Sequence, residues 1–275
     1  MNKTVENTIK YAILIALALF MTFPFIWLLL TSIKTTGNMF KIETFADIIP
    51  WPVSFENFIE VMKTVPLIPK FLFNTVIITF WGMLLGIVIS ALAAYPLARF
   101  KFPGRNFIFF MFISTMMLPT QANMIVNFIT IRKLGLFDTY IAVILPALVN
   151  VFGIFLMRQA YLTIPGELED AGRLDGCGEL SLWWHVMLPM TRPALGALSI
   201  FTFVAYWNTF MWPLVILKTE SKYPFAVGLT YLSNMFASDF RTVAAAAVIS
   251  MVPIIIVFIL MQKQFIKGIT AGAVK

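Results

Sequence analysis

Six apolar segments, each long enough to cross a lipid bilayer, constrain this sequence more than any other feature. A bilayer core about 30 Å thick needs roughly 20 consecutive apolar residues in an α-helix. The segments cover residues 11–33, 71–98, 106–130, 139–157, 193–217 and 242–262. We therefore predict an all-α integral membrane protein with six transmembrane helices, and we expect the lipid bilayer to be one of its partners.

The composition excludes several other classes of protein. Of the 275 residues, 60% are hydrophobic and only 12% are charged, whereas soluble proteins carry about 25% charged residues. The mean hydropathy is +0.89. A soluble enzyme, a nucleic-acid-binding domain and a disordered chain all need more polar surface than this. The net charge of +7 therefore indicates basic cytoplasmic loops, and no nucleic-acid partner is expected.

Basic residues predict the orientation of the chain. The loop 99–105 and the tail 263–275 each carry three Lys or Arg residues and no acid. Short loops of this kind face the cytoplasm. With six spans, both termini are then cytoplasmic, and the long segments 34–70 and 218–241 are outer loops. The first apolar stretch is longer than the roughly 7–15 residues of a signal peptide and lacks a small-residue cleavage site, so we read it as an uncleaved anchor.

The chain carries no recognisable energy source or catalytic site of its own. The six segments contain no Asp, Glu, Lys, Arg or His, whereas ion-coupled transporters usually place such groups within the membrane. There is no phosphate-binding G-x-x-x-x-G-K-[ST] loop and no Gly-Lys pair, so we expect no ATP hydrolysis by this chain. Cys177 and His185 are the only residues of their types, which excludes metal sites built on several His or Cys ligands. We expect no enzyme activity and no cofactor, which leaves a passive channel or a pump driven by another subunit.

Uncharged polar and aromatic residues within the segments have two interpretations. Amides in hydrocarbon are costly unless paired, so they either form interhelical hydrogen bonds or line a path for a hydrated neutral solute. The candidate path residues are Asn74, Gln121, Asn123, Asn150, Tyr206, Trp207 and Asn208. Pro119 and Pro146 each remove a backbone donor, so we expect a bend there, with a gate as the alternative. The Gly82-x-x-x-Gly86 pattern favours close helix packing.

The longest inner loop has the most distinctive pattern. Residues 165–190 read PGELEDAGRLDGCGELSLWWHVMLPM, which predicts two short helices separated by a break at Gly176 and Gly178. The second helix, about 179–187, is predicted to carry an apolar set for docking to another protein, or else to lie on the lipid surface. That set comprises Leu180, Trp183, Trp184 and Met187.

The spacing within this loop resembles a known signature. The loop reads Asp170-Ala171-Gly172, three residues, Gly176, nine residues, Val186, one residue, Leu188-Pro189. It resembles the cytoplasmic loop of bacterial ATP-binding-cassette (ABC) importer permeases, usually E-A-A, three residues, G, nine residues, I, any residue, L-P. The spacing matches throughout, and Asp170, Gly172 and Val186 depart from the usual residue. Segments 99–106, 207–217 and 264–275 look like the carbohydrate-uptake branch, specifically the smaller, maltose-type permease.

The resemblance implies a fold, partners and a mechanism. It implies a type I ABC importer permease fold with domains at 1–69 (anchor and outer segment), 70–264 (permease domain) and 265–275 (cytoplasmic tail). The implied partners are a second permease in a heterodimer, an ABC ATPase dimer and an extracytoplasmic solute-binding protein. The resemblance also implies which residues couple ATP hydrolysis to import. They are Asp170, Ala171, Gly172, Gly176, Val186, Leu188 and Pro189. His185 is expected on the surface of this element.

The resemblance also implies a place and a cargo. The chain would be a multi-pass protein of a bacterial or archaeal cytoplasmic membrane that translocates a sugar or oligosaccharide. Two alternatives stay open at this point: the same importer architecture for another polar solute such as glycerol phosphate, or an ATPase-independent channel. An anionic solute favours basic residues along the path, and the six segments contain none.

Overall fold

The computed structural model describes residues 3–35, 48, 51–235 and 239–271, and their regular structure is helical. Within those residues, one isolated antiparallel bridge joins Lys34 and Val53. The predicted all-α class is confirmed. Parts of three predicted segments lie outside the described residues: 36–47 and 49–50 of the first outer loop, 236–238 of the second outer loop, and 272–275 of the tail.

Three of the six predicted spans are long, continuous helices. They are α1 (Lys3–Ser32), α3 (Ile68–Arg99) and α14 (Phe240–Ala271). Their membrane-length parts are Val5–Ser32, Ile68–Arg99 and Phe240–Leu260. At about 1.5 Å of rise per residue, each exceeds the thickness of the hydrocarbon core.

The other three predicted spans are broken. Segment 106–130 contains α4 (Arg105–Thr115), a 3-10 turn at Thr120–Asn123 and α5 (Met124–Lys133). Segment 139–157 contains α6 (Tyr140–Ile144), a 3-10 turn at Leu145–Ala147 and α7 (Val151–Leu162). Segment 193–217 contains α11 (Arg192–Trp207) and α12 (Met211–Ile216). By length and composition, the described helices supply three to five spans, so the number six stays a prediction.

Proline accounts for two of these breaks, as the sequence predicted. Pro119 has extended backbone, with ψ 129°, immediately before the 3-10 turn, and the residue before a proline is also disfavoured in a helix. Pro146 lies within the 3-10 turn that separates α6 from α7, and these two helices are bent by 49°.

The described chain forms two compact units. Unit 1 comprises Met1–Pro69 with Gly228–Pro253, and unit 2 comprises Lys70–Val227 with Ile254–Lys275. In unit 1, α2 (Glu56–Thr64) is tied to the end of α1 because the Asn57 amide donates to the carbonyls of Ser32 and Lys34, both at 2.9 Å. The predicted domain boundaries are not tested by this division.

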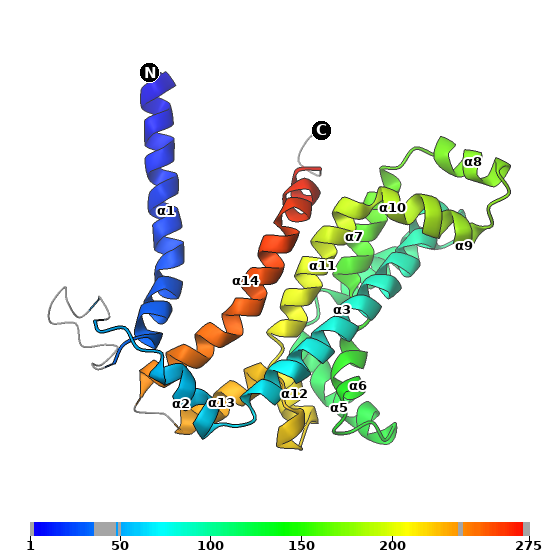
Figure 1. The fold of residues 1–275 in the computed structure, drawn as a ribbon. Coiled ribbons are helices and arrows are strands. Elements are labelled where there is room, and N and C mark those ends of the chain that lie inside the picture. The colour runs from blue at the N-terminus through cyan, green and yellow to red at the C-terminus, as the bar shows by residue number, and fades with distance from the viewer. Residues whose placement is uncertain (1–2, 36–47, 49–50, 236–238, 272–275) are drawn as a thin grey trace. The chain divides into compact units, whose positions relative to one another are not determined.

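In unit 2, the core lies where α3 packs against α7 and α11. A Cβ atom on Gly82 of α3 would lie 2.5 Å from the ring of Tyr206 on α11, and one on Gly153 of α7 would lie 2.6 Å from the Ser90 hydroxyl. Glycine therefore permits both close approaches. Figure 1 shows α8 (Glu167–Leu174), α9 (Glu179–Leu182) and α10 (Leu188–Met190) at one end of this unit, with α5, α6 and α12 at the other.

The two glycines of the G-x-x-x-G pattern provide a matched pair of variants. We expect Gly82→Ala to destabilise the protein by about 1–3 kcal/mol, because the new methyl group overpacks the interface with Tyr206. Gly86→Ala should be neutral or slightly stabilising, since its Cβ meets nothing closer than 3.8 Å and alanine is the better helix former. Thermal melts of the two purified variants in detergent check this, and equal melting temperatures would contradict it.

Candidate coupling element and solute path

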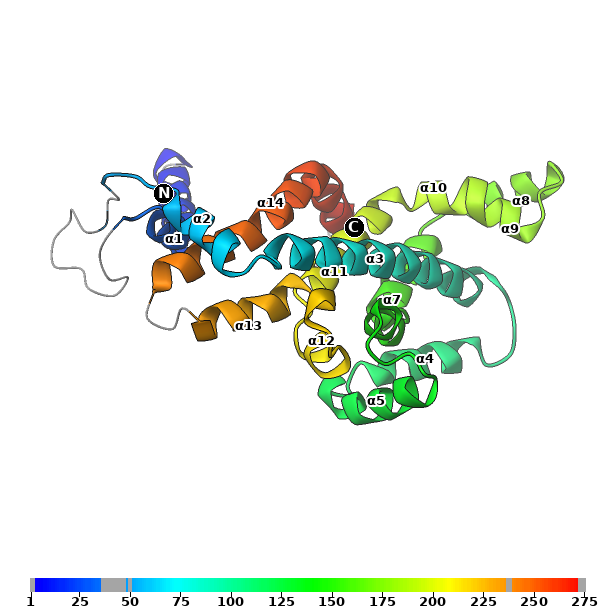
Figure 2. The ribbon, with the colours of Figure 1, turned by 60° about the horizontal axis from the view of Figure 1, so that its bottom comes forward.

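The inner loop forms the two short helices that the sequence predicted. Helix α8 ends at Leu174, and Gly176 follows with φ +83°, a left-handed conformation that favours glycine. Helix α9 then continues through a π-helical turn at Trp183–Met187 into α10, which ends at Met190. The chain next turns by 81° into α11. Figure 2 shows α8, α9 and α10 beside one another at one end of unit 2. The second helix therefore runs past its predicted end at residue 187 and includes Pro189.

Gly172 brings the two short helices into contact. A Cβ atom at this position would lie 2.5 Å from Cδ1 of Leu182, and Leu182 is fully buried. The glycine that departs from the usual signature therefore matches a large side chain on the facing helix. Asp170 on the same helix points outward, with its side chain 76% exposed.

The apolar set expected on one face of the second helix is in fact divided between two faces. Trp183 and Met187 are 4% and 0% exposed, and the Trp183 indole donates to the Tyr161 hydroxyl at 2.9 Å. Leu180 and Trp184 are 70% and 55% exposed. The prediction of a single apolar face was wrong because a buried core behind the helix uses half of the set. Exposed Leu180 and Trp184, four residues apart, form a ridge that can contact a partner.

Arg173 links the carboxylates of the element. Its guanidinium lies 3.1 Å from Glu179, 3.5 Å from Asp170 and 3.7 Å from Glu169. The hydrogen bond to Glu179 raises the pKa of Arg173. His185 lies on the exposed side, as expected, with Nδ1 3.1 Å from the Ser181 carbonyl.

Four of the seven candidate path residues are engaged inside the protein. Asn74 is fully buried, donates to the carbonyls of Ser221 and Tyr223 at 2.9 Å, and accepts from Tyr140 at 2.7 Å. Asn150 caps α7 by accepting from the Gly153 amide at 3.2 Å. The remaining two, Tyr206 and Trp207, are buried, and Trp207 stacks on Phe203. Gln121, Asn123 and Asn208 are exposed, and each lies at or beside a helix break.

Side chains from α11 and α12 stabilise the break at Pro146. In a continuous helix, the amide of residue 146 would donate to the Ala142 carbonyl, and proline has no such donor. The Trp212 indole donates to that carbonyl instead, at 2.9 Å. The Tyr206 hydroxyl donates to the carbonyl of Ile144 at 3.1 Å. The broken backbone is thereby paired, as burial in an apolar environment requires.

Asp138 lies in the short loop between the predicted segments 106–130 and 139–157 and is bonded to the predicted outer loop 218–241. Its carboxylate accepts from the backbone amides of Lys218 and Thr219, the Thr219 hydroxyl and the Lys222 ammonium, at 2.6–3.1 Å. Its φ is +60°, a conformation in which Asp and Asn are among the tolerated residues. Burial raises the pKa of Asp138, but these hydrogen bonds outweigh burial and hold the pKa well below its usual range.

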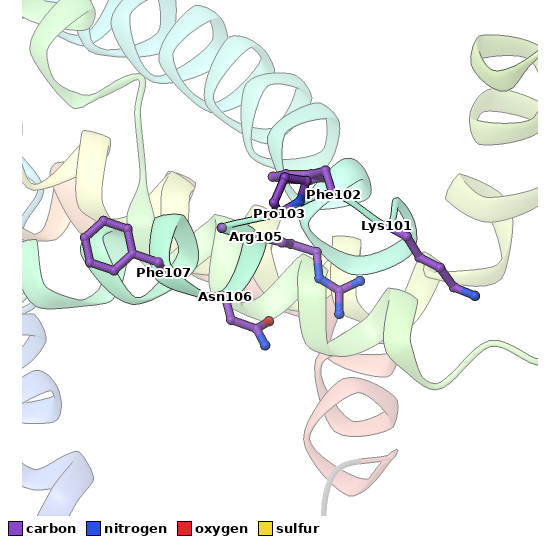
Figure 3. Close-up of a pocket in the computed structure, with 7 residues that line it drawn as sticks. Lys101, Phe102, Pro103, Arg105, Asn106 and Phe107 are labelled. Atoms are coloured by element: carbon purple, nitrogen blue, oxygen red, sulfur yellow. The ribbon is translucent and has the colours of Figure 1, made fainter.

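The loop after α3 forms an open, basic hollow. Residues 101–107 surround about 540 Å³, and Figure 3 shows the Lys101 and Arg105 side chains projecting from this loop. Arg105 also donates to the Phe100 carbonyl at 3.0 Å, which holds the loop against the end of α3.

Comparison with known proteins identifies the family. Residues 86–271 match the model of the binding-protein-dependent transport system inner membrane component. The chain belongs to this family. It is therefore a permease subunit of an ABC transporter and a multi-pass protein of the inner membrane, and the family predicted from the 170–189 signature is confirmed.

The relatives reported below match between 72% and 95% of the permease. It is 33% identical to the arabinooligosaccharides transport system permease protein AraQ of Bacillus subtilis, over 94% of this chain and 92% of that protein. It is 32% identical to the sn-glycerol-3-phosphate transport system permease protein UgpE of Yersinia enterocolitica, over 72% and 71%. A crystal structure of a bacterial ABC transporter that imports the acidic polysaccharide alginate contains a similar chain, with TM-score 0.82, 26% identity and coverage of 95% and 97%.

The Asp138 contacts predict a pH-dependent contribution to stability. Asp138→Asn keeps the side-chain shape but removes charge-assisted hydrogen bonds, so we expect a loss of about 1–3 kcal/mol at pH 7. Because the folded pKa is depressed, this stabilisation is complete above the unfolded pKa of about 3.9. It shrinks below that pH and disappears as pH falls through the folded pKa.

Thermal melts of the permease and the Asp138→Asn variant between pH 7 and pH 3 measure this difference. Asp175→Asn is the control, because the Asp175 carboxylate is exposed. A difference in melting temperature that is absent at pH 7, or that grows as the pH falls, contradicts the assignment.

Proposed function

We propose that this permease translocates a sugar or oligosaccharide into the cytoplasm and draws its energy from an ABC ATPase through the 165–190 loop. The exposed Leu180–Trp184 ridge carries the proposal. It lies within the family's signature, on a helix that the buried Leu182, Trp183 and Met187 hold in place. Large exposed apolar residues on a fixed helix are typical of a surface that docks in a protein groove.

The coupling residues divide into supporting and contacting groups in this proposal. Gly172 and Gly176 permit the close packing and the turn. Val186, Leu188 and Pro189 are half-buried and continue the second helix toward α11, while Asp170 and Ala171 are exposed and available to the ATPase. ATP-driven closure of the ATPase pair would then favour one permease conformation by binding it more tightly.

The proposed assembly contains four kinds of component in and on the membrane. This permease pairs with a second permease as a heterodimer, two ATPase subunits bind the inner face, and a solute-binding protein delivers cargo outside. The family description, binding-protein-dependent transport, supports the last of these. The orientation with both termini cytoplasmic, in a bacterial or archaeal membrane, rests on the basic loops 99–105 and 263–275.

Within the permease, the seven candidate residues take different roles. Gln121, Asn123 and Asn208 are the proposed solute contacts, since they are exposed and lie near helix breaks. Non-helical backbone at membrane depth is tolerated where it is protein-buried or lines a cavity. Asn74, Asn150, Tyr206 and Trp207 support the walls of the path, because their polar atoms or ring faces are engaged internally.

Two relatives favour different cargoes. AraQ is named for arabinooligosaccharides and the structural relative imports alginate, which supports a saccharide. UgpE is named for sn-glycerol-3-phosphate at nearly the same identity, so this anion is the second candidate. The predicted spans contain no basic residue, and this favours a neutral saccharide over sn-glycerol-3-phosphate and over an acidic polysaccharide such as alginate.

Transport measurements test the proposal directly. The complex formed by this permease, the second permease, the ATPase and the binding protein is reconstituted in liposomes. We expect ATP-dependent uptake of a labelled oligosaccharide, such as an arabino-oligosaccharide, to exceed that of sn-glycerol-3-phosphate. Preferential uptake of glycerol phosphate supports the second candidate, and solute flux without the ATPase contradicts the coupled mechanism.

The exposed ridge has its own test. We expect Trp184→Ala to weaken association with the ATPase by about 2 kcal/mol, roughly thirtyfold, as for aromatic residues at interface hot spots. Trp81→Ala on α3 is a matched control, because Trp81 is 48% exposed but lies in a membrane-spanning helix. Titration of the ATPase against the permease in nanodiscs measures both affinities, and an equal loss in the two variants argues against docking at the ridge.

A further inference from the structure

Arg99, the last residue of α3, has no role in the function proposed above. Its guanidinium donates through Nε to the Glu169 carboxylate on α8, and the two form an ion pair. The side chains are only 12% and 8% exposed. Removing two charges from water is expensive, and burial is tolerated only where the pair has good geometry and further hydrogen bonds.

Arg99 also supplies those further hydrogen bonds, and they reach a third helix. Its Nη1 donates to the carbonyls of Ile164 at 3.1 Å and Tyr161 at 3.3 Å. These carbonyls lie at and just beyond the C-terminal end of α7, where backbone acceptors lack helical donors and the helix dipole is negative. One planar group therefore connects the ends of α3 and α7 with the coupling loop.

A second, more exposed connection runs between the same elements. The Tyr95 hydroxyl on α3 donates to Glu179 on α9 at 3.2 Å, and Arg173 lies between Glu179 and Glu169. Arg173 and Glu179 are 42% and 49% exposed, so solvent and salt weaken these contacts. The buried pair is therefore the stronger of the two connections.

The neighbouring acids Glu169 and Asp170 of α8 differ in their surroundings. Glu169 contacts Arg99 inside the protein, whereas Asp170 is 76% exposed. Gly172 lets α8 pack closely against Leu182 of α9, so the two short helices form one packed element. Glu169 connects this element to α3 and α7 through Arg99.

We propose that Arg99 and Glu169 form the joint through which movement of the 165–190 loop is passed to the spanning helices α3 and α7. Both are positioning residues for transport, and neither is needed to bind the ATPase. This inference rests on the proposed function, because it presupposes that an ATPase moves the loop. The inference makes a prediction that the proposed function does not. Breaking the Arg99–Glu169 pair should let ATP hydrolysis continue without solute import, while the ATPase stays bound to the permease.

The test uses the complete complex in liposomes, with Glu169→Gln and Arg99→Lys as variants. Glutamine keeps the shape of Glu169 but removes its charge. Lysine keeps the charge of Arg99 but lacks the planar fork that reaches several acceptors at once. Lys101→Gln is the matched control, since it removes an exposed positive charge two residues away. The readouts are solute imported per ATP hydrolysed and ATPase copurified per permease.

We expect Glu169→Gln to lower the solute imported per ATP at least tenfold, with copurified ATPase within twofold of the unmodified complex. Arg99→Lys should give an intermediate ratio, and Lys101→Gln an unchanged one. An unchanged ratio in both Arg99→Lys and Glu169→Gln overturns the inference. Loss of copurified ATPase in both also overturns it, because the pair would then serve folding or docking. Absence of the ATPase from the unmodified complex indicates instead that the proposed function is wrong.

Discussion

The pairing of backbone groups in an apolar solvent is the constraint on which the rest of this structure depends. A helix in a bilayer can be interrupted only where other protein groups take up the donors and acceptors that the break releases. At Pro146 this condition is met by the indole of Trp212, which replaces the missing donor to the Ala142 carbonyl. The break at Pro146 therefore depends on aromatic side chains that donate hydrogen bonds to its backbone carbonyls.

Polar interactions are concentrated at the two ends of the second unit. Asp138 ties its own short loop to the outer loop 218–241, and the charged residues of α8 and α9 tie the inner loop to α3. Between them, α3, α7 and α11 pack through glycine and apolar contacts. The core between the two ends is mainly apolar, and it also contains interhelical hydrogen bonds, such as those from Arg158 to the Leu97 carbonyl and from Tyr206 to the Ile144 carbonyl.

The sequence was sufficient to predict the helical class, the family and the outline of the inner loop, since hydropathy, proline and spacing are local signals. It was insufficient for the faces of the second short helix. Helical periodicity assigns the same apolar role to all four residues of the set. Only the contact with the core around Tyr161 shows that Trp183 and Met187 are buried, whereas Leu180 and Trp184 are exposed.

Contacts between residues distant in sequence could not be predicted either, because hydropathy and spacing are local signals. Asn74 pairs with Ser221 and Tyr223, almost 150 residues away, so its amide was indistinguishable from a solute-binding group. Arg99 and Glu169 were visible as charges near the inner surface, but their pairing depends on how α3 and α8 meet. The one departure from the signature that the structure explains is Gly172, whose small size matches Leu182.

The contact between Gly172 and Leu182 also bears on how this loop changes during evolution and in chimaeric proteins. A related protein with alanine at position 172 must accommodate an extra methyl group, most simply through a smaller residue at 182, so we expect the two sites to vary together. A loop taken from a relative is therefore best exchanged as one block that includes both positions. Because positions 172 and 182 are only ten residues apart, one short exchanged segment can carry α8 and α9 together.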